Sequence, residues 1–213
     1  MRKVLRVLLY VLGAIIVVLL IMRLTFIETW TIPDDNDWLG VSIVPTLFTG
    51  DEVVLLTVGT PRFGELVRCE DPDKEGEWII GRVVGLGGDM VELEGPTLRV
   101  NGVRYNTVEA CKDSPFIVEH PDTNREVEVQ CSRVDIGGGW HFRGTTGKYS
   151  RRRDKRKLVG DDHVFLLSDN RDLHFDSRDY DTVPLDSCDA QIVFRLWSED
   201  GWSDSDYRMT VIR

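Results

Sequence analysis

The sequence predicts a mainly β protein, in which an N-terminal transmembrane helix precedes a β-rich domain. The first observation is an uninterrupted run of 16 residues without a charge, from Val7 to Met22. The second is a series of short apolar runs, separated by Gly, Pro, Asn and Asp turns, which is typical of strands. The third is that helical periodicity of useful length is missing after the first segment. A chain of 213 residues has room for one such domain and an insertion.

The first segment, residues 1–27, is expected to be a cytoplasmic tip and a membrane anchor. Sixteen helical residues rise about 24 Å against about 30 Å of hydrocarbon, and Arg6 and Arg23 can reach the two interfaces to close that gap. A cleavable signal peptide is the alternative. The bulky stretch from Thr25 to Trp30 offers no small-x-small cleavage site, so we predict an uncleaved anchor.

The distribution of charge predicts the orientation and excludes one class of partner. Three basic residues precede the apolar run and only Arg23 closely follows it, which favours an N-terminus in the cytoplasm and the remaining chain outside. Residues 28–213 hold 22 of the 26 basic residues and all 36 acidic ones, a net charge of −14. Nucleic-acid binding needs a basic surface, so no nucleic-acid partner is expected.

Four cysteines are present: Cys69, Cys111, Cys131 and Cys188. None forms a Cys-x-x-Cys pair, so a zinc site is not expected, and no metal or other cofactor is predicted. An exported domain with an even number of cysteines permits disulfides. Cys111 and Cys131 flank an expected hairpin and form the favoured pair, while free buried cysteines remain the alternative.

Strands are expected in order along the chain after the anchor. Asn101-Gly102 is a type I′ turn signal that joins two of them, and residues 116–119 and 126–129 straddle a second hairpin. The basic run from Lys148 to Lys157 reads as a solvated loop, with contact to anionic lipid headgroups as the other interpretation. The remaining expected strands cover residues 52–56, 64–67, 78–89 (ending in a glycine turn), 90–93, 97–100, 163–167 and 191–197.

The candidate nucleophile is Ser42, which lies in the stretch from Gly40 to Asp51. A small flexible entry and the exit at Pro45 suit a serine held at an exposed turn, with a free backbone N–H beside it. A purely structural turn is the alternative, because a motif remains a hypothesis until its context is known.

Four further boxes follow one another in order. They are RLTFIETWTIP at residues 23–33, RVVGLGGD at 82–89, LRVNGVR at 98–104 and SDNRDLHFDSRDYDTVP at 168–184. With the serine box, they resemble the bacterial type I signal peptidases. The resemblance covers the anchor and residues 23–104 and 158–197, and it is weak for 105–157. It implies a signal-peptidase-type antiparallel β catalytic domain in two parts, 28–104 and 158–213, with a smaller β-rich insertion at 105–157.

The resemblance also implies an activity and a location. Members of this family are membrane serine endopeptidases (hydrolases), which remove signal peptides from exported preproteins with a serine nucleophile and a lysine base. The expected partners are therefore signal peptides and the lipid bilayer. The expected location is the bacterial cytoplasmic membrane. A catalytically silent paralogue that binds signal peptides or membrane partners is the alternative, and the anchor argues against a soluble self-cleaving repressor of a related fold.

One departure from the family bears on the chemistry. The position of the family lysine is Gly81, while His174 stands where the family has a serine beside that lysine. A serine needs an adjacent base, and an imidazole titrates near neutrality. We therefore predict a Ser42–His174 site, with Asp176, or else Asp172, orienting the ring. The alternative is an exposed His174 in a decayed site.

Other expected roles come from the same resemblance. The segment from Ile80 to Val84 is expected to flank a substrate bound as an added strand. Six extra residues, about Asp34 to Leu39, precede the serine box, and Gly40 lacks the hydroxyl of some relatives. The expected substrate-binding residues are Ile80, Arg82 and Val83. The expected supports of the site are Asp169, Asn170, Arg171, Ser177 and Arg178.

Overall fold

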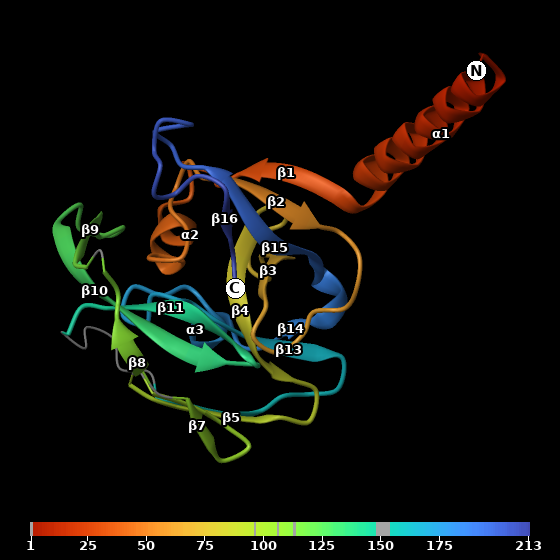
Figure 1. The fold of residues 1–213 in the computed structure, drawn as a ribbon. Coiled ribbons are helices and arrows are strands. Elements are labelled where there is room, and N and C mark those ends of the chain that lie inside the picture. The colour runs from red at the N-terminus through yellow and green to blue at the C-terminus, as the bar shows by residue number, and fades with distance from the viewer. Residues whose placement is uncertain (1, 96, 106, 113, 148–153) are drawn as a thin grey trace.

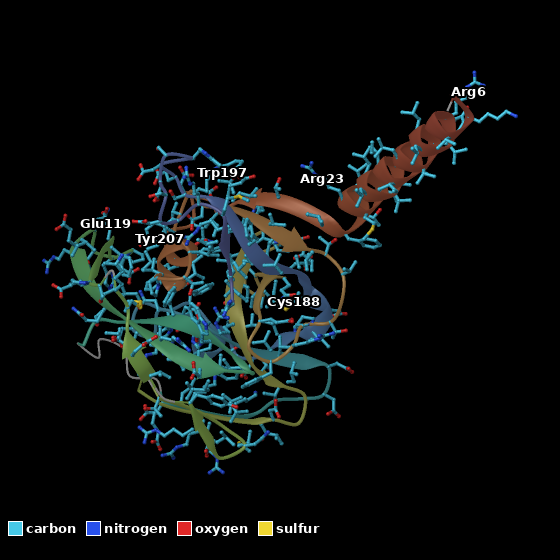
Figure 2. All side chains as sticks on the ribbon, in the orientation of Figure 1. Arg6, Arg23, Glu119, Cys188, Trp197 and Tyr207 are labelled. Atoms are coloured by element: carbon cyan, nitrogen blue, oxygen red, sulfur yellow. A yellow bond between two sulfur atoms is a disulfide. The ribbon has the colours of Figure 1, made fainter. Side chains whose placement is uncertain are left out.

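The structure is a computed structural model that describes residues 2–95, 97–105, 107–112, 114–147 and 154–213. Helix α1 (Arg2–Phe26) projects away from the β-rich remainder of the chain (Figure 1). Its segment Arg6–Phe26 has a mean hydropathy of 2.8 and is long and apolar enough to cross a membrane. Arg6 and Arg23 lie near the two ends of this segment (Figure 2), as the anchor prediction requires.

The largest sheet has eight strands in the order β1-β2-β15-β3-β4-β13-β14, with β16 added to β15. All of its pairings are antiparallel, which confirms the predicted fold class. Its strands are β1 (Ile27–Thr31), β2 (Glu52–Leu56), β3 (Leu66–Glu70), β4 (Trp78–Leu86), β13 (His163–Leu167), β14 (Val183–Pro184), β15 (Cys188–Trp197) and β16 (Thr210–Val211).

Two smaller sheets complete the β structure. One has the order β12-β5-β6-β7, formed by β5 (Met90–Glu94), β6 (Thr97–Val100), β7 (Val103–Tyr105) and β12 (Lys155–Leu158). The other joins β8 (Thr107–Ala110), β9 (Phe116–Glu119), β10 (Glu126–Ile136) and β11 (Gly139–Thr145). Both predicted hairpins are confirmed, and Asn101 and Gly102 have the positive φ values, 51° and 80°, of a type I′ turn.

The basic segment from 148 to 157 differs from its predicted loop where it is described. Residues Lys155–Leu158 form β12, which pairs with β5, and Arg156 contacts Glu92 across the pair. Residues 148–153 lie outside the described residues, so their predicted loop and lipid contact stay predictions. The basic residues are accommodated in a strand because Lys155 and Lys157 form ion pairs with Asp181 while their charged ends stay near the surface.

Two short helices were not predicted, namely α2 (Asp37–Ser42) and α3 (Ser177–Tyr180), and a 3-10 turn covers Leu185–Ser187. Helix α2 begins at Asn36, whose side chain accepts a hydrogen bond from the Leu39 N–H. A helix of six residues has little stability alone. It is held because Leu39 and the following Ile43 are buried in one cluster with Ile80 of β4.

All four cysteines are paired, so the alternative of free cysteines is wrong. The Cys111–Cys131 disulfide confirms the predicted pair. The second disulfide joins Cys69 of β3 to Cys188 of β15, which lie opposite each other in the register of the main sheet. This second bridge joins two neighbouring strands of the main sheet, of which β3 also pairs with β4.

Candidate active site

Ser42 ends helix α2 and is 1% exposed. Its Oγ donates a hydrogen bond to the Leu39 carbonyl oxygen at 3.0 Å, the bond that helical serines make to the preceding turn. The prediction of an exposed turn is therefore wrong for this structure. The difference arises because the residues preceding Ser42 coil into a helix and carry the serine into the protein.

The loop from 168 to 176 lies against the end of α2. The Asn170 N–H donates to the Ser42 carbonyl oxygen at 2.9 Å, and Asn170 Nδ2 donates to the Val41 carbonyl oxygen at 3.2 Å. Asn170 Oδ1 also accepts from the Leu173 N–H at 3.0 Å, which holds the turn that leads to His174. One asparagine thus joins the loop of the candidate base to the main chain of the candidate nucleophile.

A buried ion pair supports this junction. Arg82 Nε and Nη2 donate to the two oxygens of Asp169 at 2.8 and 2.7 Å, and both side chains are 0% exposed. Thr46 donates to the same carboxylate from the segment after Ser42. Burial alone would raise the pKa of Asp169, but Arg82 outweighs it and the pKa lies below its usual value. Arg82 and Asp169 therefore form a buried ion pair beside the segment that carries Ser42.

His174 is 3% exposed, so the alternative of an exposed loop residue is wrong. Its Nδ1 lies 2.7 Å from Asp179 Oδ2, while Asp176 Oδ1 is 4.0 Å away. Its Nε2 is buried without a hydrogen-bond partner among the described residues. In the neutral tautomer that donates from Nδ1 to Asp179, Nε2 keeps a free lone pair. Asp179, rather than Asp176, occupies the position of a residue that orients the ring.

Asp176 was predicted to orient the His174 ring, but it has a different structural role. Its carboxylate accepts from Arg178 and from the Ser168 N–H, and it caps α3. Burial raises its pKa, but Arg178 outweighs that effect and holds the pKa well below the usual value. Ser177 Oγ accepts from the Leu166 N–H, which ties α3 to β13. Asp172, the other candidate, accepts instead from Thr146.

The described residues contain one trio that resembles a metal site: His174, Asp176 and Asp179, whose ligand atoms lie within 4.8 Å of one another. The donor set fits a metal poorly. The Asp176 carboxylate is already paired with Arg178, and the Asp179 carboxylate already accepts from His174 Nδ1. The trio is better explained as the support of the imidazole.

Gly81 faces a packed core. A Cβ atom at Gly81 would lie 2.8 Å from Leu166 Cβ, and its three nearest neighbours would all belong to Leu166. Ile80, on the opposite face of β4, packs with Leu39 and Ile43 beside the serine helix. Helix α2 therefore packs against β4, and Leu166 fills the space beside Gly81. In the part of the chain that is described, no hydrogen bond joins Ser42 to His174.

Sequence reasoning missed His141 on β11. This side chain is buried, with Nε2 3.3 Å from Arg171 Nη2 and 3.7 Å from Asp169 Oδ1. Burial, followed by the charge of Arg82, lowers the pKa of His141 well below its usual value, so the imidazole is neutral. No local sequence signal could have identified His141, because the loop residues that contact it are brought to β11 by a β-bridge between Gly144 and Asn170.

Comparison with known proteins gives consistent similarities. A family profile described as "Signal peptidase, peptidase S26" matches residues 4–197. Signal peptidase I of Pseudomonas aeruginosa is 26% identical over 217 residues, covering 89% of this chain and 70% of the relative. Signal peptidase I of Bacillus caldolyticus is 25% identical, covering 74% of this chain and 76% of the relative. A solved signal peptidase I from Enterococcus faecalis overlaps with a TM-score of 0.38 at 20% identity, over 63% of this chain and 97% of that chain.

Proposed function

Because this chain belongs to the signal peptidase family (peptidase S26), we propose that it is a membrane-anchored serine endopeptidase that removes signal peptides from exported preproteins. The observation that carries the proposal is the Asp179–His174 contact. It leaves a buried, unpartnered Nε2 on a loop that Asn170 bonds directly to Ser42. An oriented imidazole close to a serine is the arrangement that activates a hydroxyl nucleophile.

In the proposed reaction Ser42 Oγ attacks the scissile carbonyl carbon and its proton passes to His174 Nε2. The imidazolium then protonates the leaving amine, and a water molecule hydrolyses the acyl-enzyme. Asp179 keeps the ring in the required tautomer. The last turn of α2 must open first, because Ser42 Oγ is bonded to Leu39 and a helical N–H points along its own helix.

Opening that turn would free the Ser42 N–H as one oxyanion donor. A second donor is offered by Thr49. Its Oγ1 lies 2.0 Å from the position that a Cβ atom on Gly40 would take, so this hydroxyl fills the space of the side chain that Gly40 lacks. The Thr49 side chain is half-buried, which leaves it within reach of an entering peptide.

The substrate would bind along β4. Strand β13 pairs with β4 only from Arg82 to Leu86, so the edge at residues 78–81 has no described partner strand on that side. An extended peptide can add to such an edge through main-chain hydrogen bonds. This placement keeps Ile80, Arg82 and Val83 beside the peptide, although their own side chains are buried in the protein.

We also propose a single-pass topology in the bacterial cytoplasmic membrane, with the N-terminus in the cytoplasm and residues 28–213 outside. The charge bias around α1 supports it. The two disulfides support it independently, because disulfides persist in oxidising compartments. A cysteine introduced at Lys74, whose side chain is 59% exposed, should react with an impermeant thiol reagent on intact cells. Protection from that reagent would contradict the topology.

A silent protein that binds signal peptides is the second candidate function. The buried Ser42, with its Oγ committed to the Leu39 carbonyl, favours it. The absence of a lysine at Gly81 favours it too. In this alternative the free edge of β4 would bind the peptide without cleaving it.

The test is cleavage of a preprotein by the full chain in detergent micelles. Ser42→Ala and His174→Ala should each abolish cleavage, because nucleophile and base act as a unit. His163→Ala is the matched control, since His163 is half-buried at the start of β13, outside the loop from 168 to 176, and its ring Nδ1 lies 3.0 Å from the Asp161 carbonyl oxygen. Activity that survives His174→Ala would refute the serine–histidine mechanism. Tight peptide binding without cleavage by the wild-type chain would favour the silent binder.

A further inference from the structure

A groove of about 610 Å³ separates the segment that carries Ser42 from strand β9 of the insertion. On one side it is lined by Gly40 and Val41 of α2 and by Thr49. On the other side it is lined by residues 117–119 of β9 and by the turn that follows them. Figure 1 shows α2 next to the hairpin of β9 and β10. Ligand sites usually have volumes of about 300–1,000 Å³, so the groove has room for a short stretch of peptide.

Two ring contacts hold β9 alongside the serine segment. Trp38 lies edge-on to His120 with ring centroids 6.1 Å apart, and Phe48 packs against Phe116 at 5.6 Å. Trp38 and Phe48 precede and follow Ser42 in the chain, while Phe116 begins β9 and His120 directly follows it. Both ends of β9 are therefore fixed beside the candidate nucleophile.

The side of β9 that faces the groove has free main-chain groups. Among the described residues, β9 pairs only with β10. The His120 N–H donates to the Arg125 carbonyl oxygen at 2.9 Å, and bonded and non-bonded pairs alternate along an antiparallel ladder. The register then puts Glu119 and Ile117 at non-bonded positions, with their N–H and C=O groups directed away from β10. Both residues line the groove, and no described residue of β10 does.

An unpaired strand edge is a template for another extended chain. Thr49, the proposed second oxyanion donor, lines the same groove, so a peptide whose scissile carbonyl approaches Thr49 would enter it on one side of the scissile bond. The signal segment is assigned to the free edge of β4. The groove would therefore receive the residues that follow the scissile bond.

The charge of the groove indicates what those residues carry. Asp34, Glu119 and Glu199 line it, and its lining residues include no lysine or arginine. A cleft lined by charges of one sign focuses the field and attracts the opposite charge. Glu119 also lies opposite Glu126 in the hairpin, where two like charges destabilise each other and a cation would offset them.

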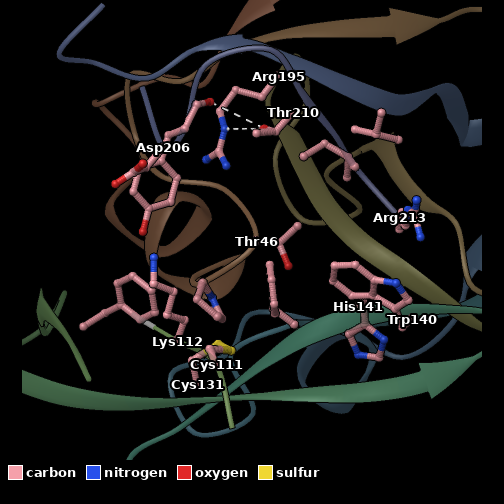
Figure 3. A pocket seen from close by; sticks show the side chains of 16 residues that line it. Thr46, Cys111, Lys112, Cys131, Trp140, His141, Arg195, Asp206, Thr210 and Arg213 are labelled. Atoms are coloured by element: carbon pink, nitrogen blue, oxygen red, sulfur yellow. Dashed lines mark hydrogen bonds between the residues drawn. A yellow bond between two sulfur atoms is a disulfide. The ribbon is translucent and has the colours of Figure 1, made fainter. Parts of the chain in front are cut away.

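A neighbouring cavity, which Phe116 helps to line, has the opposite character. Its volume is about 440 Å³, and its charged lining residues are Lys112, Arg195, Asp206 and Arg213 (Figure 3). Cations outnumber the carboxylate there, so a basic side chain would be repelled. Of these two spaces, the groove along β9 is the one that suits a basic peptide.

We propose that this groove binds the first residues of the mature preprotein as an extended strand on the edge of β9, and that Glu119 pairs with a lysine or arginine in that strand. The identity of the peptide rests on the proposed peptidase function. The mode of binding rests on the edge of β9 and on the charge of the groove.

The first experiment is isothermal titration calorimetry of the full chain in a non-ionic detergent. The probe is an eight-residue peptide of alternating lysine and threonine, and a peptide with glutamine in place of lysine is the neutral control. The lysine peptide should bind at least about tenfold more tightly, since three exposed ion pairs each contribute about twofold to threefold. This advantage should shrink in about 0.5 M salt, which screens exposed charges. Equal affinity of the two peptides, or no binding of the lysine peptide, would overturn the proposal.

The second experiment tests the edge of β9. Ile117→Pro removes an N–H that is directed away from β10, and the side chain it replaces is 60% exposed. It should weaken binding of the lysine peptide about twofold to tenfold, the value of one hydrogen bond, while Ile117→Val, which keeps the N–H, should not. An unchanged Kd in Ile117→Pro would refute the placement on β9.

The third experiment tests the charge and does not depend on the fold of the proline variant. Glu119→Gln should weaken binding of the lysine peptide about twofold to fivefold. Glu75→Gln, which removes the same charge from an exposed loop outside the groove, is the matched control. Equal effects of the two substitutions would refute the contact assigned to Glu119.

Binding and catalysis can fail separately in these experiments. A chain that binds the lysine peptide on β9 but cleaves no preprotein would refute the peptidase and keep the groove assignment. A chain that cleaves preproteins but binds both peptides equally would do the reverse. A dimer in sedimentation that Ile117→Pro abolishes, without peptide binding, would assign the edge to a second copy of the chain and overturn the proposal.

Discussion

Replacing Gly81 by alanine tests why the family lysine cannot simply be restored in this chain. The added Cβ would lie 2.8 Å from Leu166 Cβ, closer than non-bonded carbon atoms approach. Because both atoms are fixed to strands of the same sheet, a side-chain rotation cannot separate them. Gly81→Ala must therefore shift β4 or β13.

Overpacking of this kind costs about 1–3 kcal/mol of the free energy of unfolding. In a domain of this size, that cost lowers the melting temperature by about 2–12 °C. Gly81→Lys should destabilise at least as much, since its side chain begins from the same Cβ. The conflict involves Leu166 Cβ itself, so Leu166→Ala would leave it in place and only Leu166→Gly would remove it.

The assay is thermal unfolding of the full chain in detergent, followed by tryptophan fluorescence. Although Leu166→Gly will destabilise by itself, Gly81→Ala should add little in that background, which gives a coupling of about 1–3 kcal/mol in a double-mutant cycle. Gly160→Ala is the control, because its nearest neighbour would lie 3.8 Å away at His163 Nδ1, and it should change stability by less than about 0.5 kcal/mol. Additive effects of the Gly81 and Leu166 substitutions would refute the reasoning.

Three further predictions concern stability. Asp169→Asn should cost about 3–5 kcal/mol in chemical unfolding, because Arg82 would stay buried without its counter-charge. The pKa values of Asp169 and Asp176 are lowered on folding, so the stability they contribute is present above about pH 3.9 and lost as the pH falls further. Melting curves between about pH 6 and pH 2 test this, and a flat profile would contradict it. Loss of the Cys69–Cys188 bridge, with a sequence separation of 119, should cost about 5 kcal/mol, against about 3 for Cys111–Cys131 with a separation of 20. The larger loss is expected because the longer loop removes more conformational entropy from the unfolded chain. Equal losses of stability would exclude this explanation.

The features that could be predicted from sequence are those specified by neighbouring residues. The apolar run from Val7 to Met22 defines α1, and Asn101-Gly102 supplies the two positive φ values of its hairpin. The disulfide between Cys111 and Cys131 could be predicted because the hairpin between these two cysteines brings them together. The main strands carry their own turn signals, so the mainly β character followed from local patterns, while the antiparallel domain with its insertion was implied by the family resemblance.

The features that could not be predicted depend on long-range packing. The bridge from Cys69 to Cys188 requires the register between β3 and β15. Helix α2 is too short for a periodic signal, and its burial depends on Ile80. Asp179 faces His174 only because α3 starts with a capping box, in which the Asp179 side chain returns to the Asp176 N–H. Sequence spacing favoured Asp176 as the residue that orients the ring, but the Asp176 carboxylate is paired with Arg178.

The bonded state of Ser42 also bears on how the two candidate functions can be told apart. The Ser42–Leu39 hydrogen bond has a net value of about 0.5–1.5 kcal/mol, so it lowers the population of a free Oγ by no more than about tenfold. The burial of Leu39 contributes about 1.5–3 kcal/mol to holding α2 in place. Opening the last turn can leave Leu39 buried, so this contribution is not lost when Ser42 is freed. A missing general base costs far more, about a hundredfold to ten-thousandfold in rate. A loss of about tenfold relative to an active relative would therefore reflect the closed serine, whereas a loss of a thousandfold or more would mean that His174 does not act as the base.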